Sequence, residues 1–258
     1  MTNRGFTLLE VLIALAVGGI LLTAILGVYL GQSRNYEIQN LAVDVEGNLR
    51  AGMGILLQDL HQAGCDPLGT AGAGVVSAEA DSFRISMDLN ADGDVADEGE
   101  DVSYLLFTAD GRPCLSRRAT AAAADAAVAE NVEALGLAYG IDADRDGNLD
   151  ADAGGTLWVV PDAVSGNWSD LDVNDDGRID AADDTDGDGT IGGQDTGIVV
   201  DPAHVRSVRV WLLGRTDRED SSFTDGATWV IGRQVLTPQD GYRRRVLSTI
   251  VNCRNLGL

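Results

Sequence analysis

The stretch that decides the fold is the apolar N-terminal run at residues 5–31, which reads GFTLLEVLIALAVGGILLTAILGVYLG. Between Phe6 and Gly31 the only charged residue is Glu10. A run of this length can cross the roughly 30 Å apolar core of a bilayer as one helix. A cleaved secretory signal has a shorter apolar region that ends in a small-residue cleavage site. We therefore expect a membrane-spanning helix, residues 6–31, behind a polar leader, residues 1–5.

Glu10 is the unusual residue of this run. A carboxylate inside a spanning helix costs about 2.5–3.5 kcal/mol on insertion scales, which makes it a functional candidate by default. Attraction to the positive end of the helix dipole offsets only a small part of that cost. We therefore expect Glu10 to have a role beyond anchoring.

The helix is predicted to continue past the membrane, because no Pro occurs between Phe6 and Cys65. Apolar residues then recur every three or four positions, as expected for an amphipathic helix against a globular body, residues 32–64. These positions are Ile38, Leu41, Val45, Leu49, Met53, Leu56 and Leu60. An unbroken helix from Phe6 to Ala63 would be about 87 Å long.

Residues 65–258 change to short β-branched and alternating runs separated by turn residues. The runs are 83–87, 102–107, 132–139, 157–160, 205–213, 228–235 and 244–251. This pattern predicts a mostly antiparallel sheet packed on the helix, an α+β fold. The alanine-rich segment 119–129 is compatible with either a short helix or a loop.

Residues 5–10, GFTLLE, followed by VLIALA, resemble the class III signal of type IV pilins and pseudopilins. The resemblance implies that a prepilin peptidase cleaves after Gly5 and methylates Phe6. It also places Glu10 at the family's acidic fifth mature position, which is implied to pair with the N-terminal ammonium of a neighbouring subunit. Two charges that neutralise each other at low dielectric would also fix the axial register between subunits.

Further strings, at residues 59–67, 88–94, 208–213, 242–246 and 254–256, resemble the minor pilins called PilW. The resemblance implies a subunit held in the inner membrane with a periplasmic or extracellular globular domain, then incorporated into a type IV pilus. Its expected place is a priming or tip complex that serves pilus assembly, adhesion or motility. The expected partners are other pilins through the N-terminal helix, the prepilin peptidase and, as a further candidate, a tip adhesin.

Two alternatives stay open at this point. One is a minor pseudopilin of a type II secretion system, which shares the architecture. The other is a calcium-dependent adhesive or partner-docking module at the pilus tip.

The charge is strongly acidic and local. The chain has 41 Asp and Glu against 18 basic residues, all of them Arg, and a formal net charge of −23. Sixteen Asp lie in residues 142–195 and seven acids lie in residues 88–101, with only two Arg in the first segment and no base in the second. Such a balance argues against nucleic acid as a partner, because phosphate neutralisation needs a basic surface.

Residues 172–183 and 184–195 form two consecutive loops of twelve residues that fit calcium. Oxygen donors at odd positions wrap the chain around one ion, and Gly at position 6 allows the sharp turn. The candidate ligands are Asp172, Asn174, Asp176, Arg178 by its carbonyl, Asp180, Asp183, Asp184, Asp186, Asp188, Thr190 by its carbonyl, and Asp195. No residues remain between the loops for helices, so the pair resembles the calcium-wrapped repeats of thrombospondin type 3.

Two further loops are candidates for calcium. The first contributes Asp142, Asp144, Asp146, Asn148 and Asp150, but its position 12 is Ala153 and Asp152 comes one residue early. The second contributes Asp88, Asn90, Asp92 and Asp94, with Glu98, Glu100 or Asp101 available to close it. A solvated hairpin tip is the competing interpretation of the second loop. We expect Ca²⁺ to order the acidic insert, residues 142–195, once the domain is exported.

The three cysteines lie too far apart in sequence for a zinc knuckle or a redox pair. An exported domain permits disulfides, and we predict Cys65–Cys114, with Cys65–Cys253 as the alternative. His61 and His204 are isolated. The sequence has no nucleophile elbow, phosphate loop or zinc motif, so we expect no enzyme activity.

Overall fold

The computed structural model describes residues 7–120, 124–162, 167–192 and 200–256. The chain divides into two compact units, Met1–Val43 and Asp44–Leu258. Helix α1 (Leu8–Gln62) passes through the boundary between them. The second unit thus begins about twenty residues before the predicted start of the β-rich domain at residue 65, because the end of α1 supplies part of its core.

The first unit contains the N-terminal part of α1, which includes the apolar run. Its large aliphatic side chains are exposed in the single chain, and its most apolar window of eighteen residues has a mean hydropathy of 2.7. Among the described residues, α1 is the one helix that is long and apolar enough to cross a membrane. The helix is continuous through this stretch, since Gly18, Gly19 and Gly27 are helical. Gly5 and Phe6, the predicted processing residues, lie outside the described residues.

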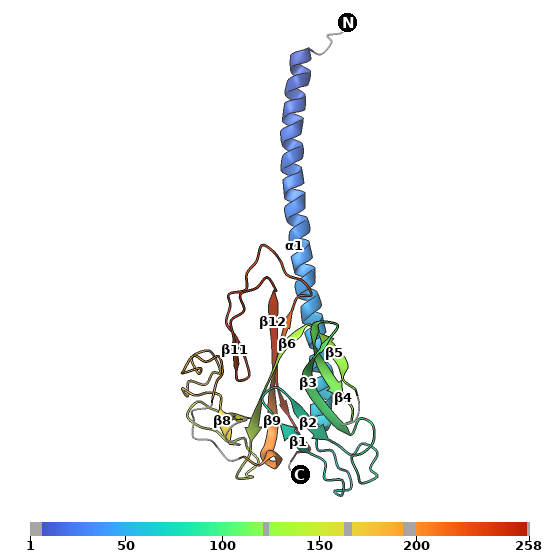
Figure 1. Cartoon of the computed structure of the whole chain (residues 1–258), viewed down its shortest axis with the longest axis vertical. Coiled ribbons are helices and arrows are strands. Elements are labelled where there is room, and N and C mark those ends of the chain that lie inside the picture. Colours follow the sequence, from blue (N-terminus) through green and yellow to red (C-terminus); the bar gives the residue numbers. More distant parts are fainter. Residues whose placement is uncertain (1–6, 121–123, 163–166, 193–199, 257–258) are drawn as a thin grey trace. The chain divides into compact units, whose positions relative to one another are not determined.

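The second unit contains two antiparallel five-stranded sheets (Figure 1). The first has the order β1 (Val75–Ala78), β2 (Phe83–Ser86), β3 (Asp101–Ala109), β4 (Arg112–Arg118) and β5 (Ala126–Glu130). The second has the order β12 (Arg244–Asn252), β9 (Val205–Arg215), β6 (Val132–Ile141), β7 (Trp158–Pro161) and β8 (Trp168–Asp170). A short 3-10 turn, η1 (Pro202–His204), precedes β9. The predicted α+β fold is confirmed, and the alanine-rich segment left open above supplies β5.

The end of α1 forms one wall of the main core. Its buried apolar residues are Val45, Leu49, Met53, Leu56 and Leu60. Their spacing places them on one face of the helix, and they cluster with side chains from both sheets. The amphipathic pattern therefore predicted correctly which face of this half of the helix is buried.

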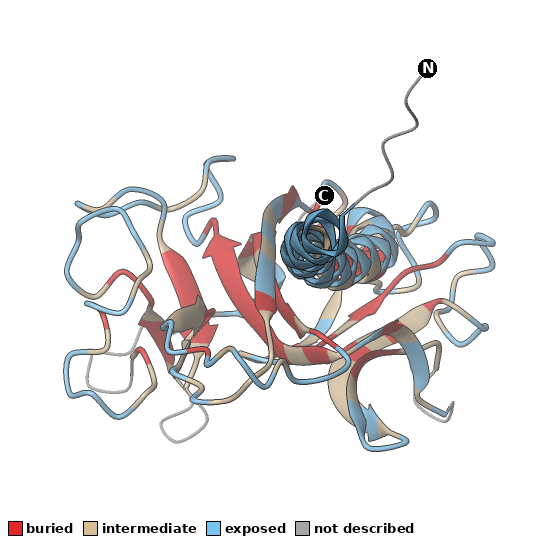
Figure 2. Cartoon of the chain, turned by 90° about the horizontal axis from the view of Figure 1, so that it is seen from above, coloured by how far each residue is buried: buried red, intermediate tan, exposed pale blue. Residues whose placement is uncertain are grey.

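A second, smaller core covers the other face of the β12–β8 sheet. Its centre includes Trp158, Trp211 and Ile231, and a hairpin of β10 (Trp229–Ile231) and β11 (Gln234–Leu236) helps to cover it. The hairpin approaches β6 closely at Gly136, where an added Cβ would lie 2.4 Å from the backbone nitrogen of Gly232. Gly136 thus allows two backbones to touch. Figure 2 shows buried strand segments in the interior and mostly exposed loops around them.

The predicted disulfide between Cys65 and Cys114 is wrong, because all three cysteines are free. The C=O group of Cys65 accepts from Asp88, just after β2. Ser86, at the end of β2, pairs with Asp101 at the start of β3. Cys114 pairs with Phe107, six residues further along β3. That offset is about 20 Å in a strand, whereas a disulfide needs Cα atoms within about 7 Å. The alternative partner, Cys253, is buried and also free.

Candidate functional site: the acidic loops and the helix start

The loop at residues 172–183 is closed by its own carboxylates. Asp172 accepts hydrogen bonds from the backbone N–H groups of Asp176 (3.0 Å) and Gly177 (2.8 Å). At the far end, Asp183 accepts from the N–H groups of Asn174 (3.3 Å) and Asp180 (2.8 Å). The carboxylates at the first and twelfth positions of this predicted loop therefore both accept hydrogen bonds from backbone N–H groups inside the loop.

All four predicted loops share one backbone geometry. The carboxylate at position 1 accepts from the N–H of Gly at position 6, and the carboxylate at position 5 accepts from the N–H of position 7. The residues at position 1 are Asp88, Asp142, Asp172 and Asp184. The residues at position 5 are Asp92, Asp146, Asp176 and Asp188. The residues at position 7 are Asp94, Asn148, Arg178 and Thr190, and each donates its N–H to the carboxylate at position 5 of its own loop.

Positive φ angles at positions 4 and 6 produce this repeated turn. Position 6 is glycine in every loop, with φ between 83° and 93°, which is the conformation that glycine adopts without strain. Position 4 has φ between 56° and 73°, and the four residues there are Ala91, Arg145, Asp175 and Gly187. Four separate segments therefore fold alike because they share the same spacing of Asp and Gly.

The loops differ in how they close. Glu100 is the closing residue at 88–100, because its carboxylate accepts from Leu89 (2.9 Å) and Asn90 (3.4 Å). Asp101, one of the other residues that the sequence offered, forms an ion pair with Arg84 instead. In the loop that begins at Asp142, Asp150 accepts from the N–H of Ala143 (3.2 Å). Asp195, the predicted closing ligand of the loop that begins at Asp184, lies outside the described residues.

Five of these carboxyl-bearing residues are buried, at 7% exposure or less: Asp88, Glu100, Asp142, Asp172 and Asp183. Burial raises the pKa of Asp183, and the charges of Asp172 and Asp180 raise it further, while backbone hydrogen bonds oppose the shift. Buried carboxylates that face one another are costly unless a cation or a proton neutralises them. Two triplets also hold carboxylate oxygens within 4.8 Å of one another: Asp142, Asp144 and Asp146, and Asp184, Asp186 and Asp188.

The fold also forms a cluster of carboxylates that the spacing of acidic residues in the sequence did not predict. Asp152, Asp170 and Asp175 come from three segments and hold carboxylate oxygens within 4.8 Å of one another. Burial raises the pKa of Asp170 to about 7, with a further contribution from Asp152. This explains why Asp152 does not close the loop that begins at Asp142. No periodic spacing links the three residues, so only the folded arrangement could reveal the cluster.

Glu10 caps the start of α1. Its carboxylate accepts from the backbone N–H (2.8 Å) and the hydroxyl (2.9 Å) of Thr7, and its own N–H donates to that hydroxyl (3.3 Å). This reciprocal pair is a capping box, which satisfies donors that a helix start leaves free. In the single chain Glu10 is exposed and has this local role.

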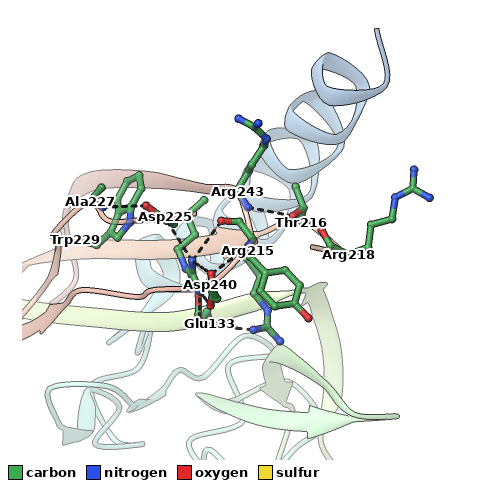
Figure 3. Close-up of polar contacts among 11 residues, drawn as sticks. Glu133, Arg215, Thr216, Arg218, Asp225, Ala227, Trp229, Asp240 and Arg243 are labelled. Carbon is green, nitrogen blue, oxygen red and sulfur yellow. Dashed lines mark hydrogen bonds and ion pairs between the residues drawn. The ribbon is translucent and has the colours of Figure 1, made fainter. Parts of the chain in front are cut away.

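Sequence reasoning also missed a buried cation at the start of β12. The Arg244 side chain is fully buried, and its guanidinium donates to Glu133 on β6 (2.6 Å), Asp240 (2.7 Å) and Asp225 (3.2 Å). Figure 3 shows Glu133, Asp225 and Asp240, which come from different parts of the chain, close together in this cluster. Burial alone would lower the pKa of Arg244, but the hydrogen bonds to Asp240 and Glu133 raise it. The cluster ties β12 to β6 and to the long connection before it.

Two family models match the chain. A family model described as Type IV Pilus-assembly protein W matches residues 103–255, which is more than half of the chain. A model of the prokaryotic N-terminal methylation motif matches residues 1–26. Among solved structures, the chain is similar to a type IV-like pilin from Thermus thermophilus, at 15% identity and a TM-score of 0.39, over 83% of this chain and 98% of that one. No curated protein matches the chain.

Proposed function

Because the chain belongs to the family of the type IV pilus-assembly protein W, and is a minor pilin incorporated into pili, we propose that it acts in the priming or tip complex with a calcium-ordered insert. The family is structural, and its role implies processing by a prepilin peptidase and contact with other pilins. The apolar helix and the N-terminal motif indicate membrane anchoring before assembly. The globular unit would then fold on the periplasmic side, where calcium is accessible.

The observation that carries the calcium proposal is the geometry repeated in four loops. In each loop the carboxylates at positions 1 and 5 hold the same backbone turn. In the loops that begin at Asp142 and Asp184, three carboxylate oxygens also lie within 4.8 Å of one another, which suits a cation that prefers oxygen ligands. The buried carboxylates Asp172 and Asp183 lie at opposite ends of one loop and would share the charge of one ion. We place the ions in the loops that begin at Asp172 and Asp184, with the loops at Asp142 and Asp88 as further candidates. The cluster of Asp152, Asp170 and Asp175 lies beside them.

The insert supports a position at the tip or in the priming complex. Its loops follow β6 and flank β7 and β8, the far edge of the second sheet, and they are mostly exposed (Figure 2). A closely packed shaft would leave little room for these loops, whereas a tip or priming complex would accommodate them. In assembly, Glu10 would exchange its contact with Thr7 for the N-terminal ammonium of a neighbouring subunit.

A pair of variants in the native host tests this function. Replacing Asp172, Asp183 and Asp184 by Asn keeps the side-chain size but removes the charges that calcium needs. Replacing Asp110 by Asn, in the exposed turn after β3, is the control outside all four loops. We expect fewer pili, or pili without attachment, for the triple variant and normal pili for the control. Normal piliation and attachment of the triple variant would contradict the proposal.

A further inference from the structure

The outer edge of β12 is open, unlike the other sheet edges among the described residues. β1 is four residues long and bulged, β5 is bulged, and β8 has three residues. Short length and bulges are ways in which proteins protect sheet edges from unwanted pairing. β12, by contrast, has nine residues in unbroken register with β9 and contains no Pro.

The hydrogen bonds at the two ends of β12 show which backbone groups face outward. The N–H of Cys253 donates to Arg206 (2.8 Å), and the N–H of Thr216 donates to the C=O of Arg243 (3.0 Å). In an antiparallel ladder the direction of these groups alternates with each residue. The odd-numbered residues of β12 thus bond to β9, and the N–H and C=O groups of the even-numbered residues point away from it. In the described part of the chain β12 has no second strand partner.

The side chains at this edge suit strand addition. Residues 246–252, VLSTIVN, carry no charge and are rich in β-branched types. Val246 is 44% exposed and Ile250 is 53% exposed, with exposed Ser248 between them. Leu247 and Val251, on the opposite face, pack against the main core. The strand is therefore held firmly while its edge and one face remain accessible.

The segments that form this edge are basic in sequence, but four of their arginines, Arg206, Arg215, Arg243 and Arg244, already pair with carboxylates. Residues 205–215 and 241–256, which include β9 and β12, contain seven Arg and no acid, although the net charge is −23. Arg245 and Arg254, at the two ends of the edge, are exposed, and no ion pair of either is found among the described residues. Seven residues of β12, residues 246–252, lie between them and span about 23 Å.

We propose that the outer edge of β12 is a docking site for an extended segment of another protein, which adds as a sixth strand and carries carboxylates near Arg245 and Arg254. Main-chain hydrogen bonds from the even-numbered residues would supply affinity, and the flanking charges would select the partner. A second copy of this chain is a poor occupant, because two chains of net charge −23 repel each other. The proposal does not depend on calcium binding.

The test uses the full chain in detergent and a labelled peptide of alternating Val and Thr flanked by Asp pairs. A peptide with Lys pairs in their place is the charge control. The variant Ser248→Pro removes an outward N–H and no bond to β9, at an edge position where Pro is tolerated. Ser248→Val is its matched control. The double variant Arg245→Gln and Arg254→Gln tests the flanking charges without touching the strand.

We expect the Asp-flanked peptide to bind at least about tenfold more tightly than the Lys-flanked one. Ser248→Pro should lower the affinity for the Asp-flanked peptide about tenfold or more, whereas Ser248→Val should change it little. The double Arg variant should bind the Asp-flanked and Lys-flanked peptides equally. On peptide binding, hydrogen exchange should slow at the amides of Val246, Ser248 and Ile250. Absent binding, unchanged affinity of Ser248→Pro, or slowing confined to other amides would overturn the proposal. A wild-type dimer that Ser248→Pro abolishes would overturn the assigned partner.

Discussion

Arg117 on β4 donates from its Nε atom to the Asp59 carboxylate on α1 at 2.7 Å, with a second bond from its terminal nitrogen at 3.2 Å. The hydroxyl of Tyr104 on β3 donates to the same carboxylate at 2.5 Å. Burial and the bond to Asp59 raise the pKa of Tyr104, so it stays a donor. One carboxylate on the helix thereby holds two strands of the first sheet.

Replacing Asp59 by Ala should destabilise the globular unit by about 3–5 kcal/mol, because it leaves the partly buried Arg117 without its counter-charge. Urea unfolding of the full chain in detergent measures this change. Glu46→Ala is the control, since Glu46 forms an exposed ion pair with Arg50 and should cost at most about 0.5 kcal/mol. Equal midpoints for the two variants would argue against the role of the Asp59 contact.

Cys253 should resist alkylation in the native protein. Burial raises the pKa of its thiol to about 12, so at pH 8 only about one molecule in ten thousand carries the reactive thiolate. Treatment with iodoacetamide before and after denaturation, followed by mass spectrometry, measures the protection. Rapid labelling of native Cys253 at pH 8 would contradict it. The same spectra, recorded without reductant, should show no link between Cys65 and Cys114.

Two variants separate the capping role of Glu10 from its proposed assembly role. Glu10→Gln keeps an acceptor for Thr7 but removes the charge, whereas Thr7→Ala removes the hydroxyl contacts of the cap and keeps the charge. We expect processing of both and incorporation into pili only of Thr7→Ala. Cell fractionation with antibody detection measures both steps. Loss of incorporation in both variants would instead indicate that the cap is what matters.

Gly136→Ala should loosen the hairpin of β10 and β11. The added methyl group would meet the backbone of Ile231 and Gly232 at 2.4–2.7 Å, and overpacking of this kind costs about 1–3 kcal/mol. The environment of Trp229, which lies on β10, should change with it. Tryptophan fluorescence and the unfolding midpoint measure the effect. Gly47→Ala, at an open helix position, is the control and should not lower the midpoint.

The sequence predicted the features that depend on local spacing. The helix followed from the absence of Pro and the recurrence of apolar residues between Val45 and Leu60. The turns of the acidic loops followed from Asp and Gly at fixed positions, and Glu100 was among the closing residues considered. The helix and the loop turns could be predicted because each depends on residues that lie close together in the sequence.

The features that the sequence did not predict depend on strand order. Cys65 and Cys114 are the two cysteines nearest each other in sequence, yet the register of β3 separates them in the fold. Arg244 reaches Glu133 only because β12 and β6 flank β9, and Asp152 meets Asp170 only through folding of the insert. No short-range pattern encodes such neighbours, so the sequence alone could not identify them.

The central claim, that calcium orders the acidic insert, is tested most directly by the thermal unfolding midpoint of the full chain in detergent. The comparison is 10 mM Ca²⁺ against a chelator, with Mg²⁺ as the control ion. For a Kd of about 10⁻⁴ M, a ligand at a hundredfold excess stabilises by about 2.7 kcal/mol per site. The account predicts a midpoint several degrees higher in Ca²⁺ than in Mg²⁺ or chelator, and protection of residues 167–192 from proteolysis. An identical midpoint and identical proteolysis in Ca²⁺ and chelator would contradict it.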